Sequence, residues 1–192
     1  MKKLFLAIVM AVAAFSAQAQ IYVGGEAGFW RDYDNNKTSV KLYPEIGYNL
    51  DEKWSVGTKI GYEYDYGATT GQVIEGIGTT LKVKTKTHSF IIAPYARYIY
   101  AKFGPVNLFL DGGFSFFTYK EEIDGQKEDA KNAWEVGVKP GLSVNLTEKL
   151  SFVSHVGFLG WRDSDGSKIW DKEGFGFDLS GNSLTFGLYY NF

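Results

Sequence analysis

The chain contains no cysteine, only 4 prolines and only 2 histidines among its 192 residues. The absence of cysteine excludes a disulfide scaffold and a lipid anchor attached through a cysteine thiol. The scarcity of histidine limits enzyme hypotheses, because acyl transfer usually needs a histidine beside the nucleophile. We expect no metal site and no cofactor.

Long apolar runs and basic stripes are also missing after residue 20. Although 45% of the residues are hydrophobic, no run reaches the roughly eighteen apolar residues that a membrane-spanning helix needs, so any span must be a strand. The formal net charge is -2, and no basic stripe is present, which excludes nucleic acid as a partner.

The first residues have the pattern of an export signal. Lys2 and Lys3 precede an apolar run over 4–15, and Ala-Gln-Ala at 17–19 offers a cleavage site between small residues. We therefore predict that 1–19 is a signal peptide that is removed, and that 20–192 forms one domain. A membrane anchor left in place is the disfavoured alternative, because the run is short and ends in small residues.

Aromatic residues and glycine are abundant, with 17% aromatic residues and 23 glycines. Such a composition suits a sheet with one apolar face and one face of small residues. Alternation with a period of two predicts eight strands. Their ranges are 21–31, 38–49, 54–65, 87–101, 106–119, 132–145, 149–160 and 181–192.

Short and long connections alternate between these strands. The short ones lie at 49–53, 101–105 and 145–149, and the long polar ones at 32–37, 66–86, 120–131 and 161–180. This order predicts an all-β fold, an eight-stranded antiparallel up-and-down transmembrane β-barrel with both termini on one side.

A repeated hairpin supports the same count. The segment 44–55 aligns without gaps on 140–151, and Pro94 begins a looser third copy. Each copy is a strand, a tight turn and a strand. Because proline lacks the N–H that a ladder needs, we expect a bulge at Pro44, Pro94 and Pro140.

Alternation also separates two faces of the sheet. In the second to sixth ranges every charge falls on the face of small residues, and the other face carries Trp, Tyr, Phe and Leu. An eight-stranded barrel has little room inside, so the bulky face should point outward, unlike in a soluble lipocalin-like barrel. We predict a nearly balanced charge network that fills the lumen. Its members are Glu26, Lys41, Glu45, Lys59, Glu63, Arg97, Asp111, Glu135 and Lys139.

The final strand carries a recognisable row of apolar residues. The row is Leu184, Phe186, Leu188, Tyr190 and Phe192. It resembles the C-terminal assembly signal of outer-membrane proteins. Together with Pro94-Tyr95-Ala96-Arg97-Tyr98 and the two hairpins, it makes the chain similar to the outer-membrane protein β-barrel domain family, often labelled porin-family, which includes small eight-stranded barrels. The resemblance implies insertion by the barrel assembly machinery into a Gram-negative outer membrane, with both termini periplasmic, and no single activity.

Four functions remain open, of which a soluble secreted binding barrel is the last. The leading hypothesis is a structural or interaction role through extracellular loops, with lipid, lipopolysaccharide or an unidentified ligand as partner. A narrow porin-like pore is the first alternative, which the lumen charges disfavour. A lipid A-modifying enzyme is the second. Each histidine adjoins a serine, His88–Ser89 and Ser154–His155, and neighbours on a strand face opposite ways, so we assign no catalytic residue.

A row of lysines extends the fourth predicted strand. Lys82, Lys84 and Lys86 share the parity of the outward residues Phe90 and Ile92. Above the membrane, such a row would meet the phosphates of lipopolysaccharide. The other interpretation is a solvated ribbon at the cell surface.

Overall fold

The computed structural model describes residues 20–33, 36–72, 80–164, 173–179 and 184–192, and for 68–72 and 80–82 the backbone alone. The signal peptide predicted at 1–19 lies outside these residues. Within the described part of the chain, no helix has the length and apolar character needed to span a membrane.

Eleven strands form one antiparallel sheet in the described residues. Most of them alternate glycine, serine or charged residues with aromatic and aliphatic ones, a pattern that suits a pleated ribbon with two unlike faces. The strands are β1 Ile21–Asp32, β2 Lys37–Asn49, β3 Trp54–Gln72, β4 Thr80–Phe103, β5 Val106–Ile123, β6 Gln126–Lys127, β7 Lys131–Asn145, β8 Leu150–His155, β9 Phe158–Ser164, β10 Gly174–Asp178 and β11 Thr185–Asn191.

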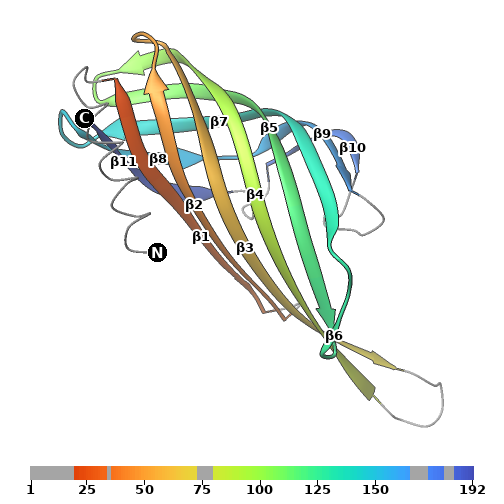
Figure 1. Cartoon of the computed structure of the whole chain (residues 1–192). Coiled ribbons are helices and arrows are strands. Elements are labelled where there is room, and N and C mark those ends of the chain that lie inside the picture. The colour runs from red at the N-terminus through yellow and green to blue at the C-terminus, as the bar shows by residue number, and fades with distance from the viewer. Residues whose placement is uncertain (1–19, 34–35, 73–79, 165–172, 180–183) are drawn as a thin grey trace, which may run out of the picture.

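These eleven strands make an eight-stranded barrel (Figure 1). The numbers differ because two of the eight walls each consist of two shorter strands and because β6 is only a short return. β8 and β9 lie end to end along β7 and form one wall. β11 pairs with β8 and β10 pairs with β9, so that β10 and β11 form the next wall. β6 is a two-residue return beside the end of β5. The predicted eight-stranded fold is confirmed.

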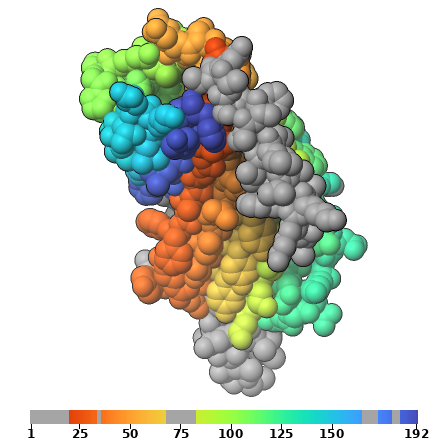
Figure 2. Space-filling model, turned by 60° about the vertical axis from the view of Figure 1, so that its left-hand side comes forward, coloured from red at the N-terminus to blue at the C-terminus, as the bar shows by residue number. Residues whose placement is uncertain are grey.

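The barrel closes where the last strand meets the first. β11 pairs with β1 from Tyr22↔Asn191 to Ala27↔Phe186. Figure 2 shows the two strands next to each other on one face of the molecule. We call this junction the seam.

The two ends of the barrel differ. At one end lie three tight connections, 50–53, 104–105 and 146–149. Both ends of the described chain are there too, since the Phe192 N–H donates to the Ile21 carbonyl at 3.1 Å. We call it the turn end. At the opposite end, the extension end, β3 and β4 continue beyond their neighbours as a hairpin (Figure 1).

The long connection predicted at 66–86 is therefore wrong in its bounds. β3 runs to Gln72 and β4 begins at Thr80, with register partners throughout. Lysine alternates with valine and threonine from Lys82 to Thr87, and β-branched residues favour an extended backbone. The polar composition of 66–86 favoured a long connection, whereas the β-branched residues favour the strand that the structure shows.

The expected bulges are wrong at Pro44 and Pro94. The ladders β2–β3 and β4–β5 skip two residues beside each proline but keep the same register on either side. Opposite Pro140, the three steps along β7 from Val138 to Gly141 face four steps from His155 to Leu159. That one-residue bulge lies in the neighbouring wall, between β8 and β9, where the Val156 N–H donates to the Pro140 carbonyl at 3.0 Å.

Candidate functional site

Side chains alternate between the interior and the exterior along every wall, and most of the buried positions face inward. All nine residues of the predicted lumen network have interior parity. Lys41, Lys59, Glu63 and Lys139 are half-buried. The remaining five, Glu26, Glu45, Arg97, Asp111 and Glu135, are buried. The structure gathers seven of the nine into two clusters, and Lys41 and Glu63 form a separate pair.

The central cluster is built on two carboxylate–cation pairs. Arg97 donates from Nε and Nη2 to the two oxygens of Asp111 at 2.7 and 2.8 Å. This two-point geometry is stronger than a single contact and fixes both side chains. Lys59 Nζ lies 2.6 Å from Glu26 Oε1 and 3.7 Å from Glu45 Oε2. The paired charges offset the cost of removing each ion from water.

Glu26 is the most connected member of the central cluster. Besides Lys59, its carboxylate accepts hydrogen bonds from Tyr189 at 3.0 Å and from the hydroxyl of Thr185. His155 Nδ1 lies 3.1 Å from Glu26 Oε2. Glu26 therefore joins β1 to three other strands, β3, β8 and β11, across the centre of the barrel.

His155 is a member that sequence reasoning missed. Its Nε2 lies 2.7 Å from Asp111 Oδ2, while its Nδ1 faces Glu26. An imidazole can donate to two carboxylates only when both ring nitrogens carry a proton. Lys59 and Arg97 supply the cations of the central cluster, and the His155 ring lies between the carboxylates of Glu26 and Asp111. The available signal was its parity with Ser151 and Val153, which face inward on the same strand.

A second cluster lies on the extension side of the first. Glu135 accepts from Ser115 at 3.0 Å and from Lys139 at 2.5 Å. Arg162, which the sequence analysis did not single out, donates to Glu135 at 3.2 Å and to Asp178 at 3.4 Å. Separately, Glu63 accepts from the hydroxyl of Tyr43 and lies 3.7 Å from Lys41 Nζ.

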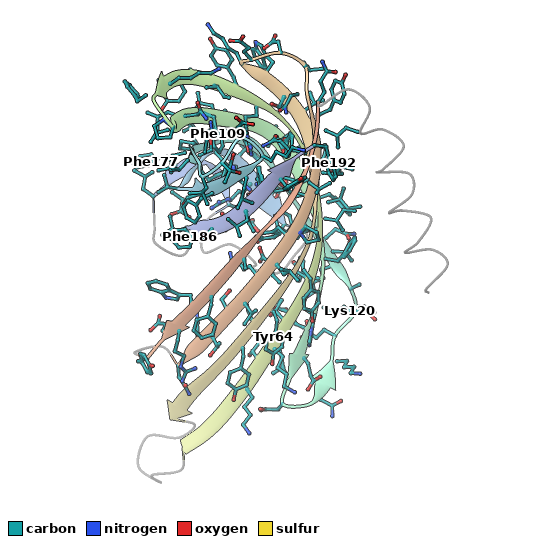
Figure 3. The ribbon with its side chains drawn as sticks, turned by 90° about the vertical axis from the view of Figure 1, so that its left-hand side faces the viewer. Tyr64, Phe109, Lys120, Phe177, Phe186 and Phe192 are labelled. Carbon is teal, nitrogen blue, oxygen red and sulfur yellow. The ribbon has the colours of Figure 1, made fainter. Side chains whose placement is uncertain are left out.

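Aromatic rings fill the interior between the charges, which sequence reasoning also missed. Tyr22, Phe109 and Tyr189 are buried at the turn end, and the guanidinium of Arg97 lies 4.0 Å from the centre of the Phe109 ring. Figure 3 shows Phe109 within the ring of strands. These rings fit because each covers a glycine on the next strand. A Cβ at Gly47 would lie 2.2 Å from Tyr22 Cζ, and one at Gly141 would lie 2.4 Å from Phe109 Cζ.

The remaining interior space is small. A cavity of about 40 Å³ lies between the two clusters, and its lining includes Lys59, Asp111, Ser115, Glu135 and Lys139. It has room for on the order of three water molecules. Among the described residues, no group of three or more His, Cys, Asp or Glu side chains could hold a metal ion.

The other sequence-predicted residues lie on the exterior. Leu184, Phe186, Leu188 and Tyr190 are exposed along β11, and Phe192 follows them against the Tyr190 ring, with centroids 5.1 Å apart. Lys84 and Lys86 lie on the outer face of the extension, where Lys86 Nζ is 2.8 Å from Glu122 Oε1. Lys82 is described by its backbone alone, paired with Thr70.

Comparison with known proteins gives the same architecture. Over residues 4–192 the sequence matches the outer membrane protein beta-barrel domain family. The chain is similar to the N-terminal β-barrel domain of OprF from Pseudomonas aeruginosa, with 13% identity, coverage of 91% of this chain and 98% of that one, and a TM-score of 0.52. A major outer membrane protein from Thermus thermophilus gives 13% identity, 90% and 98% coverage, and a TM-score of 0.56.

Both solved structures support the fold alone, because their sequence identities are low. A search of curated protein sequences found no match. The family match over nearly the whole length confirms the resemblance seen in the sequence and implies an outer-membrane location. The chain belongs to the outer membrane protein beta-barrel domain family.

Proposed function

We propose that this protein is a structural barrel that does not conduct ions and that makes its outward contacts at the extension end. The observation that carries the proposal is the filled interior. Two charge clusters and the buried rings of Tyr22, Phe109 and Tyr189 occupy the lumen, and the cavity between them is about 40 Å³. A hydrated ion needs a continuous aqueous path, which this packing interrupts.

The proposal includes an orientation. Outer-membrane barrels have short periplasmic turns and longer extracellular loops. The turn end, with both ends of the described chain, then faces the periplasm, and the extension end faces outward. Lipopolysaccharide is the proposed surface partner, together with a ligand that the sequence does not identify. The apolar row of β11 is the proposed recognition element for the barrel assembly machinery.

Single-channel recording in planar bilayers tests the closed interior. We expect no steady unitary conductance from the purified, folded protein. The double variant Phe109→Ala with Tyr189→Ala removes two of the buried rings at the turn end. It serves as the control in which the lumen has been opened. A steady conductance from the unmodified protein would favour the narrow pore instead.

The geometry also disfavours a lipid A-modifying enzyme. Ser151 donates its hydroxyl proton to Asn145 at 3.0 Å, and both ring nitrogens of His155 face carboxylates. Neither residue is placed to activate the other as a nucleophile. Mass spectrometry of lipid A from cells with and without the protein should give identical spectra, and a new lipid A species would support the enzyme hypothesis.

A further inference from the structure

On the exterior of β3, β4 and β5, apolar residues give way to polar and basic residues at one level along the barrel. Towards the turn end the outward residues are apolar, and Ile60, Ile92 and Phe116 are register neighbours that are all exposed. Towards the extension end, the next outward positions on β4 and β5 include His88 and Lys120, which are register partners. Figure 3 shows Tyr64 and Lys120 on the extension side of Phe109. Basic groups directly above an apolar band lie at the depth of lipid headgroups.

Two tyrosines orient His88. The Tyr62 hydroxyl lies 2.6 Å from His88 Nδ1. The ring of Tyr64 packs on the same imidazole, with centroids 5.0 Å apart. When Tyr62 donates to Nδ1, the ring proton lies on Nε2. The exposed imidazole then presents a fixed donor to an anion on the outer surface.

Lys120 is an exposed cation beside His88. Its side chain is exposed, and within the described part of the chain it makes no ion pair or hydrogen bond. Lys86, one outward position further along β4, instead donates to Glu122 at 2.8 Å, and that hydrogen bond raises the pKa of Lys86. Among the described residues, the side chains of Lys84 and Lys120 therefore both lack an ion pair or hydrogen bond, and of the two Lys120 is the register partner of His88.

We propose that His88 and Lys120 bind a phosphate group of lipid A, the membrane anchor of lipopolysaccharide, on the outside of the barrel wall. Adjacent strands hold the two donors side by side, so that one phosphate can accept from both. Tyr62 is a positioning residue, because it fixes the imidazole without contacting the phosphate. The inference rests on the proposed function, which places the extension end at the outer leaflet.

Native mass spectrometry tests the site with lipids of defined structure. The folded protein in detergent is titrated with bisphosphorylated lipid A, with lipid A that lacks both phosphates, and with phosphatidylglycerol. We expect the double variant His88→Gln with Lys120→Gln to bind bisphosphorylated lipid A about tenfold more weakly than the unmodified protein. Lipid A without phosphates should bind both proteins equally weakly.

A matched control changes two lysines at the turn end, Lys53→Gln with Lys102→Gln, and should bind lipid A as the unmodified protein does. Heat-dependent gel mobility verifies that each variant is folded. Equal binding of bisphosphorylated lipid A by the two double variants would overturn the site. Equal binding of phosphatidylglycerol and bisphosphorylated lipid A by the unmodified protein would overturn the choice of lipid.

A second measurement separates this inference from the proposed function. The chain has no cysteine, so that Lys84→Cys provides a single thiol on the outer face of the extension. A membrane-impermeant maleimide should label it on intact cells. Labelling without selective lipid A binding would overturn the phosphate site and leave the orientation standing, whereas absence of labelling would overturn both.

Discussion

His155 links two carboxylates across the narrow interior of the barrel. Its two ring nitrogens contact Asp111 and Glu26, and the two carboxylates come from strands on different sides of the interior. Removing one partner from a buried charge cluster leaves the remaining charges unpaired. This destabilises the fold more than replacing the whole cluster with apolar residues would.

We expect His155→Gln to lower the free energy of unfolding by about 3 kcal/mol, because glutamine cannot reach Asp111 and Glu26 together and leaves a buried carboxylate without its hydrogen-bond partner. Urea unfolding of the protein in detergent, followed by tryptophan fluorescence, measures the change. His88→Gln is the matched control on the exterior and should change stability by less than about 0.5 kcal/mol. An equal loss of unfolding free energy in both variants would mean that His155 contributes packing alone and that its contacts with Asp111 and Glu26 add no stability.

Asp51 illustrates a residue-scale effect at the turn end. Its carboxylate accepts from the backbone N–H groups of Lys53 and Trp54 at 2.7 and 2.8 Å. These hydrogen bonds lower the pKa of Asp51 below its ordinary value of 3.8. The folded pKa is thus below the unfolded one, so the stabilisation is present above the unfolded pKa and is lost as the pH falls through the folded pKa.

Titration by NMR, followed through the Asp51 side-chain carbons, should give a pKa below 3.8. Substitution Asp51→Asn should make stability in this acidic window less dependent on pH. A measured pKa at or above the ordinary value would show that the turn does not hold the carboxylate as described.

At the scale of elements, the sequence predicted the walls better than their ends. Period-two alternation located the eight predicted strands, since the charged residues of a wall share its interior face. It did not show that β3 runs to Gln72 and β4 begins at Thr80, or that a bulge at Val156–Gly157 divides the seventh wall. The long connection predicted at 161–180 is wrong as well, because it contains the end of β9 and all of β10. Those features depend on pairing with neighbours, which a single strand does not encode.

The same limit applies to the interior. Charges on a small-residue face were visible in the sequence, and the structure places all nine inside. Tyr22, Phe109 and Tyr189 were not visible as interior residues, because their place depends on glycines that lie opposite on other strands. His155 and Arg162 belong to the clusters for the same kind of reason, through partners far away in the chain.

A variant with a shortened extension tests whether the barrel folds without it. We expect a variant that replaces 68–84 with Asn-Gly, so that Gly67 and Thr85 flank a tight turn, to fold with unchanged heat-dependent gel mobility. Residues 67 and 85 are register partners, which makes this a natural place for a hairpin turn. Loss of folding would show that the extension stabilises the barrel and is not an independent surface element.

For the molecule as a whole, the seam decides whether the sheet is a barrel. β1 and β11 pair over six residue positions, and Glu26 reinforces this junction from inside through Thr185 and Tyr189. An unpaired strand edge in hydrocarbon would leave backbone groups without hydrogen bonds, each at a cost of several kcal/mol.

A disulfide across the seam tests the closure. Val23 and Tyr190 are register partners, at a spacing that lies within the range for a disulfide. The double variant Val23→Cys with Tyr190→Cys should oxidise to one intramolecular species, detected by its gel mobility after heating without reductant. Val23→Cys with Phe186→Cys, which lies roughly 13 Å further along the strand, should remain reduced. Comparable oxidation of both pairs would argue against a fixed register.

The position of Glu26 also bears on the order of events during insertion. Its partners Thr185 and Tyr189 belong to the last strand, and until that strand arrives the carboxylate must remain hydrated, because an ion is not released from water before its partners replace the water. A nascent barrel therefore holds water at its centre while its outer face is already in contact with lipid. We expect the joining of β11 to β1 to expel most of that water, so that the seam and the packed interior form in the same final step.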